Sequence, residues 1–422
     1  MYLIIFSIWP QFSAYKIPGV PALEPQRILY AALLIWLVIL TFTNNVAREL
    51  LVIRIKQGSI PIISLVFLYG THIFVSLFGL TPLPSLFLAI RELITTALIF
   101  FVALVAIKND GDFAKIFFTL SLATIVVSLM ALVESVLKHN LFASWVPLSS
   151  DYALWATTDR IRDGTYRAQA TFDNPLLLVD YLILLLPIVF YTAINDTHKI
   201  GRIVGFLASI LLPLAIFRTG SRSGVLIFFI EIGLILILWI VRNLRFRRRP
   251  MLTYFLAITV ALMACIATFG LNFAKNVIIG TSSEEMMSSS ARLTMIRRAW
   301  EEISAGHLFG FGFGKAGSII GIRTGEPGTW LYVLDNYFLT LLLDSGIVSL
   351  FAFLVFSSWM LYSNLYIALS KNDTKGAMAS YLFSATIGFL SIKLISSQTQ
   401  IFPIFFILAA GTLTLLTFKE MK

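Results

Sequence analysis

Long apolar runs alternate with short polar segments along almost the whole chain. A helix that crosses the hydrocarbon core of a bilayer needs about 20 mostly apolar residues, with a range of about 17 to 25. This pattern predicts an all-α, polytopic membrane helix bundle with about twelve transmembrane helices. The predicted spans are 2–15, 27–43, 60–79, 84–107, 113–137, 176–194, 201–217, 223–241, 251–270, 338–368, 377–395 and 401–418.

Two of these runs are irregular. The first contains Pro10 and is followed by Pro18, so we expect it to be tilted or only partly inserted. The run 338–368 is longer than a span requires, and Gly346 is where we expect it to break into a short interfacial helix and a span.

Composition supports a membrane protein rather than a series of soluble domains. Hydrophobic residues make up 58% of the chain and charged residues only 13%, against roughly 25% charged in soluble domains. We therefore expect 1–422 to form a single integral membrane domain. The single cysteine, Cys265, excludes an internal disulfide and a thiolate metal site. No cleavage-site pattern follows the first apolar run, so we expect it to be retained.

The positions of the basic residues predict an orientation. Five arginines crowd the short segment 242–249, and short loops rich in Lys and Arg stay in the cytoplasm. Because successive spans alternate in direction, all the remaining short basic loops and both termini are then also predicted to lie in the cytoplasm. The same alternation places two long segments outside, at about 138–175 and about 271–337, and we expect the second to be a large helical external loop.

Arginine also collects on the predicted outer face, where the charge rule gives no reason for it. The external segments and one external turn carry Arg160, Arg162, Arg167, Arg218, Arg222, Arg292, Arg297, Arg298 and Arg323. The net charge of +10 thus divides between the two membrane faces. We expect no nucleic acid as a partner.

Arg218 and Arg222 lie four residues apart in a turn that also contains Gly220 and Gly224, and no acidic residue is within four positions of either. Like charges at this spacing repel each other, whereas guanidinium groups beside a helix N-terminus suit an anion. Contact with lipid headgroups is the alternative. We favour anion binding.

Arg292 follows Ser288–Ser290, a predicted helix start, and has no acidic residue three or four positions away, so we favour a functional role. Arg297 and Arg298 each have a glutamate four positions later, and we expect surface salt bridges there.

Three other segments leave alternatives open. The alternating glycines of 310–314 suit either a phosphate-binding backbone or a turn at the membrane surface. Asp335, just before the run 338–368, suits either a general base or a helix cap. Asn174 and Pro175 predict a helix start, and Arg167 upstream carries no assignment by itself.

Taken in order, these motifs resemble the O-antigen ligase and polymerase family of bacterial polysaccharide assembly. The resemblance covers nearly the whole chain, and the ordered set carries it rather than any single motif. Its segments are Ile17-Pro18-Gly19-Val20-Pro21 through Pro25-Gln26-Arg27-Ile28-Leu29, Arg167 with Thr171-Phe172 and Asn174-Pro175, Thr219-Gly220-Ser221-Arg222-Ser223-Gly224, Ser290-Ala291-Arg292, Gly310-Phe311-Gly312-Phe313-Gly314, Asp335-Asn336 and Gly346.

The resemblance implies a GT-C type fold and an inverting glycosyltransferase that works without a metal or cofactor. Such an enzyme polymerises oligosaccharide repeat units linked to polyprenyl (undecaprenyl) pyrophosphate, on the outer face of the bacterial inner membrane. The expected partners are this donor, an acceptor glycan, the bilayer, and a chain-length regulator or flippase. The implied pyrophosphate and substrate ligands are Arg167, Arg218, Arg222, Arg292 and Asn336, and the implied catalytic residues are Asp335, Arg222 and Arg292.

Two alternatives remain open. The ligases of this family, which transfer polysaccharide to lipid A-core, typically have histidine where this chain has Asp335, so we favour a polymerase. A flippase or transporter for the same lipid-linked sugars is the alternative from another class. Ionisable residues in the middle of the spans would favour transport, but only His72 and Glu231 are predicted to lie there. The simpler interpretation is that these two residues form a buried pair and satisfy each other's polar groups.

The orientation predicts a labelling pattern. In a Cys265→Ala background, Glu285→Cys should react with a membrane-impermeant maleimide in intact cells, and Arg247→Cys should react only after lysis. Labelling of Glu285→Cys only after lysis would contradict the topology.

Overall fold

A computed structural model describes residues 1–13, 25–145, 159–162, 164–247, 283–324 and 331–417. Within these ranges the chain is almost entirely helical, with two small antiparallel hairpins. Cys265, the predicted span 251–270, and Ile17 to Pro21 lie outside the described residues.

The helices follow the apolar runs closely. The first half contains α1 (Tyr2–Ile8), α2 (Pro25–Thr43), α3 (Asn45–Gln57), α4 (Ser59–Phe78), α5 (Pro82–Glu92), the π-helix η1 (Leu93–Ala97), α6 (Leu98–Ala106), α7 (Asp110–Leu137), the 3-10 turn η2 (Ala143–Trp145) and α9 (Pro175–Asn195). The second half contains α10 (Lys199–Arg218), α11 (Arg222–Arg247), α13 (Ser283–Ser304), α14 (Ala316–Ile320), α15 (Tyr337–Ser370), α16 (Thr374–Lys393) and α17 (Phe402–Thr417). The hairpins pair β1 (Ile161–Arg162) with β2 (Thr165–Tyr166) and β3 (Ile322–Thr324) with β4 (Leu331–Val333).

Eight helical stretches of the described residues are long and apolar enough to cross a membrane. They are Pro25–Thr43, Ser59–Phe78, Pro82–Ala106, Asp110–Leu137, Pro175–Asn195, Lys199–Arg218, Arg222–Arg245 and Tyr337–Ser370. Large apolar side chains on α2, α4 and α10 are left exposed, as lipid contact requires. The chain is a polytopic membrane protein.

The predicted number of about twelve spans is not confirmed. The run 2–15 does not form a span, because α1 has only 7 residues and ends where Trp9 turns extended, just before Pro10. The runs 377–395 and 401–418 do form helices, α16 and α17, but neither belongs to the eight. Polar residues lower the mean hydropathy of α16, and the described part of α17 has 16 residues.

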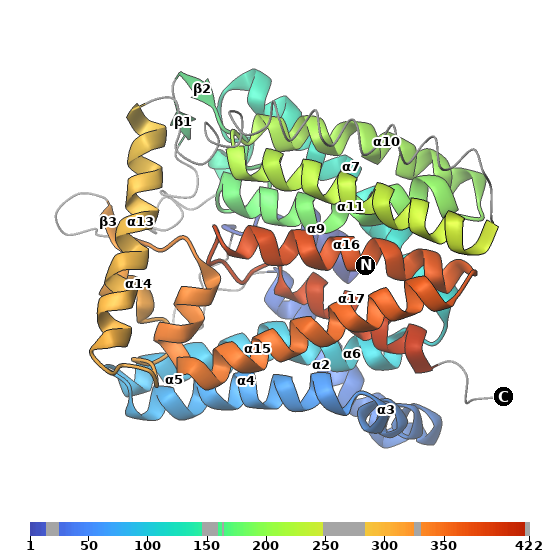
Figure 1. Ribbon diagram of the computed structural model, residues 1–422, viewed down its shortest axis with the longest axis horizontal. Coiled ribbons are helices and arrows are strands. Elements are labelled where there is room, and N and C mark those ends of the chain that lie inside the picture. Colours follow the sequence, from blue (N-terminus) through green and yellow to red (C-terminus); the bar gives the residue numbers. More distant parts are fainter. Residues whose placement is uncertain (14–24, 146–158, 163, 248–282, 325–330, 418–422) are drawn as a thin grey trace.

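The long helices lie side by side, and their connections gather at two opposite ends of the bundle (Figure 1). One end carries the hairpins, α13, α14 and the connection between α16 and α17. The other end carries α3, the connection from α15 to α16 and the C-terminal end. Helix α13 crosses the first end, roughly perpendicular to the long helices (Figure 1). The described parts of the two segments predicted to lie outside thus share one end of the bundle.

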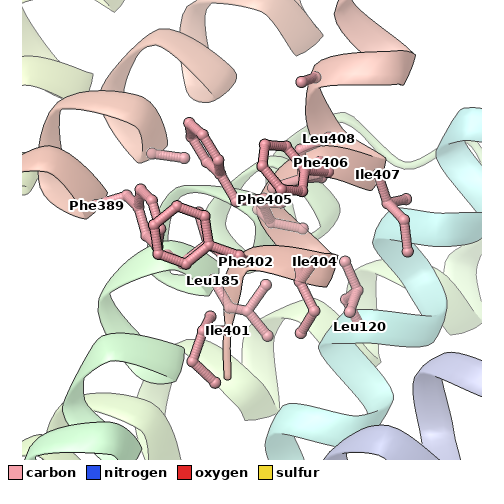
Figure 2. Packing of buried hydrophobic residues seen from close by; sticks show 14 of the residues in the cluster. Leu120, Leu185, Phe389, Ile401, Phe402, Ile404, Phe405, Phe406, Ile407 and Leu408 are labelled. Carbon is pink, nitrogen blue, oxygen red and sulfur yellow. The ribbon is translucent and has the colours of Figure 1, made fainter. Parts of the chain in front are cut away.

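The core surrounds α9 and the first half of α17. Helix α9 is apolar on all sides and almost fully buried, as expected for a helix enclosed by others. Figure 2 shows Phe402, Phe405 and Phe406 of α17 packed among residues of the neighbouring helices. The rings of Phe389 and Phe405 stack with centroids 4.2 Å apart.

Helix α15 is broken at Gly346, as predicted, because its φ of +81° and ψ of 179° are not helical. The freed carbonyls accept hydrogen bonds from the glycine-rich segment: Phe311 N–H donates to Leu343 O at 2.7 Å, and Gly312 N–H donates to Asp344 O at 3.0 Å. A Cβ on Gly346 would lie 2.6 Å from Phe309 O. The close packing of two backbones therefore requires glycine here.

Gly346→Ala should lower the thermal midpoint of unfolding in detergent. A side chain at positive φ costs about 1–3 kcal/mol, and the clash with Phe309 adds to this. Gly70→Ala is the matched control, since nothing lies within 4 Å of the added carbon on helix α4. Equal midpoints for the two variants would contradict the assignment of Gly346 as a required break.

Candidate active site

A buried carboxylate holds the segment that precedes α9. Glu134 of α7 accepts hydrogen bonds from Tyr166 Oη at 2.7 Å and Gln169 N–H at 3.1 Å, and also from Ala170 N–H. Ala170, which donates one of these hydrogen bonds, adopts a left-handed φ of 50°. Asn174 then caps α9 by accepting from Leu177 N–H at 3.0 Å, and Pro175 occupies the first turn, as predicted.

This segment delivers Arg167 to the turn between α10 and α11. The Nε of Arg167 donates to Thr219 O at 2.8 Å, and Ala168 N–H donates to Arg218 O at 2.9 Å. Gly220 has a φ of +63°, and a Cβ there would lie 3.2 Å from Cγ of Arg167. The structure thus brings together two arginine motifs that are about fifty residues apart in the sequence.

Arg222 is the first residue of α11 and is partly buried. Ser221 precedes it, and its Oγ accepts from Gly224 N–H at 3.2 Å, which is N-cap geometry. Arg222 therefore lies at the positive end of the dipole of α11. Arg218, in the last turn of α10, has an exposed side chain.

Arg292 of α13 forms an ion pair with Asp335. The Nε of Arg292 lies 3.5 Å from Oδ2 of Asp335, and the two side chains are 24% and 18% exposed. The cap of α15 is Asn336, whose side chain accepts from Leu339 N–H at 3.1 Å. Asp335 is thus not the cap residue, and its carboxylate points to an arginine.

Several further arginines surround this pair. Burial raises the pKa of the Asp335 carboxyl, while Arg292, Arg162 and Arg167 oppose that rise. Burial, together with the nearby charges of Arg162, Arg160 and Arg292, lowers the pKa of Arg167 to about 10, and the charge of Asp335 opposes this shift. Three arginines therefore interact with the Asp335 carboxylate, and a fourth, Arg160, lies near Arg167. The surplus positive charge suits an anion with several charges.

An apolar cavity of about 610 Å³ adjoins this cluster, between α11, α13 and α16. Leu226, Ile227, Leu293 and Leu394 are among its apolar lining residues. Its polar lining comes from Arg292 and from serines on all three helices, including Ser223 next to Arg222. The arrangement fits a molecule with a long apolar part and a charged group.

A fully buried ion pair supports the site from within the bundle. Lys393 Nζ lies 2.6 Å from Oδ2 of Asp180, which also accepts from Ser396 Oγ at 2.9 Å. The ammonium group lies 5.1 Å from the ring centroid of Phe389 and 5.3 Å from that of Phe402. This network fixes the start of the segment 394–401, whose Ser397 Oγ donates to Leu334 O, directly before Asp335.

Outside the site, the sequence-based expectations have mixed outcomes. Arg297 pairs with Glu301 at 3.2 Å, as predicted. The prediction for Arg298 is wrong, because its guanidinium donates to Gly321 O at 3.2 Å. The predicted helix start at Ser288–Ser290 is also wrong, because these serines lie inside α13, whose described residues are Ser283–Ser304.

The glycine-rich segment serves packing in this structure. The N–H groups of Phe311 and Gly312 bind the carbonyls of broken α15, and the Asp344 carboxylate accepts from Lys315 and Ala316 N–H at 2.7 Å and 2.6 Å. These donors are occupied, so the geometry favours the turn over the phosphate-binding alternative.

The two central ionisable residues do not pair with each other. His72 Nδ1 lies 3.3 Å from Ser349 Oγ, and its ring lies 4.7 Å from that of Phe313. Glu231 is buried against Gly388, and neither carboxylate oxygen has a hydrogen-bond partner among the residues that the structure describes. The expectation of a mutually satisfied pair is wrong.

Arg160 and Arg162 are residues of the cluster that the motifs did not identify. Asp159 and Asp163 flank them in the sequence, and such neighbours suggest ordinary surface ion pairs. Their proximity to Arg167 and Asp335 depends on the docking of the β1–β2 hairpin, which is a long-range contact.

The buried ion pair predicts a non-additive stability effect. Asp180→Leu or Lys393→Met alone should cost about 3–5 kcal/mol, because each leaves an unpaired buried charge, whereas the double variant should recover most of the loss. The free energy of unfolding in mixed micelles measures this. A double variant that loses the sum of the single effects would contradict the pairing.

Comparison with families of known proteins finds a match to part of the chain. Residues 207–354 match the family model Wzy_C, described as O-antigen ligase. The match includes Arg218, Arg222, Arg292, Asp335 and Asn336, whereas Arg167 lies before it. No curated protein matches the chain. Residues 207–354 are thus an O-antigen ligase family domain within a polytopic membrane protein, and this family acts in the transfer of lipid-linked glycans.

Proposed function

We propose that the protein is a glycosyltransferase that polymerises oligosaccharide repeat units carried on polyprenyl pyrophosphate, with its active site on the outer face of the bacterial cytoplasmic membrane. The observation that carries this proposal is the Arg292–Asp335 pair, which lies in a cluster of arginines beside an apolar cavity. The family domain supports lipid-linked glycan transfer as the reaction class.

The arginine cluster is the proposed binding site for the pyrophosphate of the donor. Arg167, Arg222 and Arg292 present planar guanidinium groups, which can each make two hydrogen bonds to phosphate oxygens. Arg218, exposed at the end of α10, adds positive charge at the rim. The first isoprene units of the carrier then occupy the apolar cavity between α11, α13 and α16.

In the proposed reaction, Asp335 accepts the proton of an acceptor hydroxyl. The hydroxyl oxygen attacks the anomeric carbon from the face opposite the pyrophosphate, so a new glycosidic bond forms with inversion. The bond from the anomeric carbon to the phosphate oxygen breaks, and its electron pair leaves on the pyrophosphate. Arg222 and Arg292 stabilise that charge. The Asn336 oxygen caps α15, so a substrate contact would come from its amide nitrogen.

Donor binding would also activate the base. Arg292 and Asp335 are 3.5 Å apart, which is long for a charged hydrogen bond. A pyrophosphate that binds Arg292 weakens the ion pair between this arginine and the Asp335 carboxylate. Because the positive charge of Arg292 lowers the pKa of Asp335, neutralising that charge makes the carboxylate a better proton acceptor.

A ligase that transfers finished chains to lipid A-core is the second candidate, favoured by the description of the matching family. Purified protein given only lipid-linked repeat units separates the two. A polymerase lengthens the polyprenyl-linked chain by whole repeats, whereas a ligase gives product only when lipid A-core is added. A chain-length regulator or a flippase would be a partner of the polymerase.

The sharpest prediction concerns Asp335→Asn. This variant keeps the side-chain shape, and Asn336 still caps α15, so the fold should remain. Loss of a general base should lower turnover of a defined lipid-linked repeat unit by about 100- to 10,000-fold, with donor binding retained. Arg297→Ala is the matched control, because this exposed residue pairs only at the surface with Glu301.

The pH profile gives a second readout of the same residue. As the pH is lowered, turnover should fall because Asp335 becomes protonated. Burial raises the pKa of Asp335, so this fall should begin at a higher pH than the titration of an ordinary aspartate would give. Arg162→Gln should shift the fall to still higher pH, since Arg162 opposes that rise. Unchanged turnover in Asp335→Asn would remove this residue from the mechanism.

A further inference from the structure

A second cavity, which the proposed donor site does not use, lies at the junction of α1, α2, η1 and α17. Its volume is about 500 Å³, within the range of about 300–1,000 Å³ that small-molecule sites occupy. Its polar lining includes Gln11, Gln26, Arg27, Glu92, Asp173 and Gln400. Gln26 and Arg27 belong to a sequence motif that the donor site leaves unexplained.

A π-helical turn forms one wall of this cavity. The span Pro82–Ala106 changes from α to π geometry at Leu93–Ala97, and Thr95 and Thr96 of that turn line the cavity beside Glu92. Such turns inside α-helices occur frequently at functional sites. Ionisable and hydroxyl groups in a membrane span are costly, so their convergence on a cavity indicates a ligand.

The charges of this cavity are balanced, in contrast to the arginine cluster. Arg27 and Arg91 face Glu92 and Asp173, and three glutamine amides add donors and acceptors. Both amide atoms of Gln11 are buried and lack a hydrogen-bond partner among the described residues. Buried amides are normally paired, so this one is available for a ligand. Balanced charge with many amide and hydroxyl groups suits an uncharged, polyhydroxylated ligand rather than a phosphate.

A single segment, 394–401, separates this cavity from Asp335. On one side, Ser397 Oγ donates to Leu334 O, next to Asp335. On the other side, Gln400 Nε2 lies 3.5 Å from Asp173 Oδ2, and the Thr399 hydroxyl donates to the Glu92 carboxylate. Glu92 also lies close enough to Tyr337 to interact with it electrostatically. The cavity and Asp335 therefore both adjoin the segment 394–401.

We infer that this cavity binds sugar units of the acceptor glycan, behind the unit whose hydroxyl reacts at Asp335. The assignment to the acceptor rests on the proposed transfer reaction, whereas the binding of an uncharged glycan does not. Two ligand chemistries then occupy two sites: the phosphate end of the donor at the arginines, and hydroxyl groups of the acceptor at the amides.

The test uses two probes on full-length protein in lipid nanodiscs. One probe is the reducing oligosaccharide released by mild acid from the host's own lipid-linked repeat unit. The other is polyprenyl pyrophosphate without sugar. The double variant Gln11→Leu/Gln400→Leu removes two lining amides. Thr119→Val is the control, since Thr119 of α7 is partly exposed, does not line the cavity, and donates its side-chain hydrogen bond to its own helix.

The double variant should bind the oligosaccharide about tenfold or more weakly, as two lost hydrogen bonds predict, and should raise KM for the acceptor. Its affinity for polyprenyl pyrophosphate, and both affinities of Thr119→Val, should match the wild type. Equal oligosaccharide affinity in wild type and double variant would overturn the inference, as would wild-type protein that does not bind the oligosaccharide at millimolar concentration.

The remaining outcomes separate this inference from the proposed function. If the double variant loses affinity for polyprenyl pyrophosphate as strongly as it loses affinity for the oligosaccharide, the cavity belongs to the donor site and the inference is overturned. If the oligosaccharide binds and its binding depends on the two amides, but the protein does not lengthen a glycan, the cavity is supported as a glycan site and the polymerase function is refuted.

Discussion

The hydrocarbon of a bilayer offers no water to satisfy a polar group, and this constraint organises the whole molecule. Backbone groups must bond within helices, and charges must lie at the ends of the spans or be paired. Most of the described chain follows both rules, and Glu231, a buried carboxyl group without a hydrogen-bond partner among the described residues, is an exception. The arginine cluster lies at one end of the bundle, and the deeply buried Lys393 is neutralised by Asp180 at 2.6 Å (Figure 1). A polar site can therefore exist only where the helices end or break.

The breaks in the helices are where the two sites form. Gly346 interrupts α15 and receives the glycine-rich segment, which ties the polypeptide between α13 and α15 to the bundle. The π-turn at Leu93–Ala97 opens a polar cavity in a span. Between the two sites runs 394–401, which is held by the Asp180–Lys393 pair. Rigid support of this kind keeps functional groups in place while substrates change.

The sequence alone predicted much of this, because the strongest signals are local. Apolar runs located the long helices, and Asn174 and Gly346 marked a cap and a break that the structure contains. The lack of a local acidic partner pointed to Arg292, whereas only the family resemblance pointed to Arg167, and the structure places both near Asp335. Such signals depend on composition and on neighbours within four residues, which a single sequence displays directly.

What the sequence could not predict depends on contacts between distant segments. Arg298 had a suitable glutamate four residues away, yet its partner is Gly321 O, because α14 packs beside α13. The Asp180–Lys393 pair joins residues more than two hundred positions apart. Arg160 and Arg162 belong to the cluster only through the docked hairpin. Tertiary packing decides each case, and no local pattern encodes it.

The central claim is that the arginine cluster recognises a lipid pyrophosphate through paired hydrogen bonds rather than through charge alone. The most direct measurement compares the affinities of polyprenyl pyrophosphate and polyprenyl monophosphate for the protein in nanodiscs. The account predicts a clear preference for pyrophosphate that Arg222→Lys abolishes and Arg297→Lys preserves, since lysine keeps the charge but loses the two-pronged contact. Equal affinity for the two lipids, or an unaltered preference in Arg222→Lys, would contradict it.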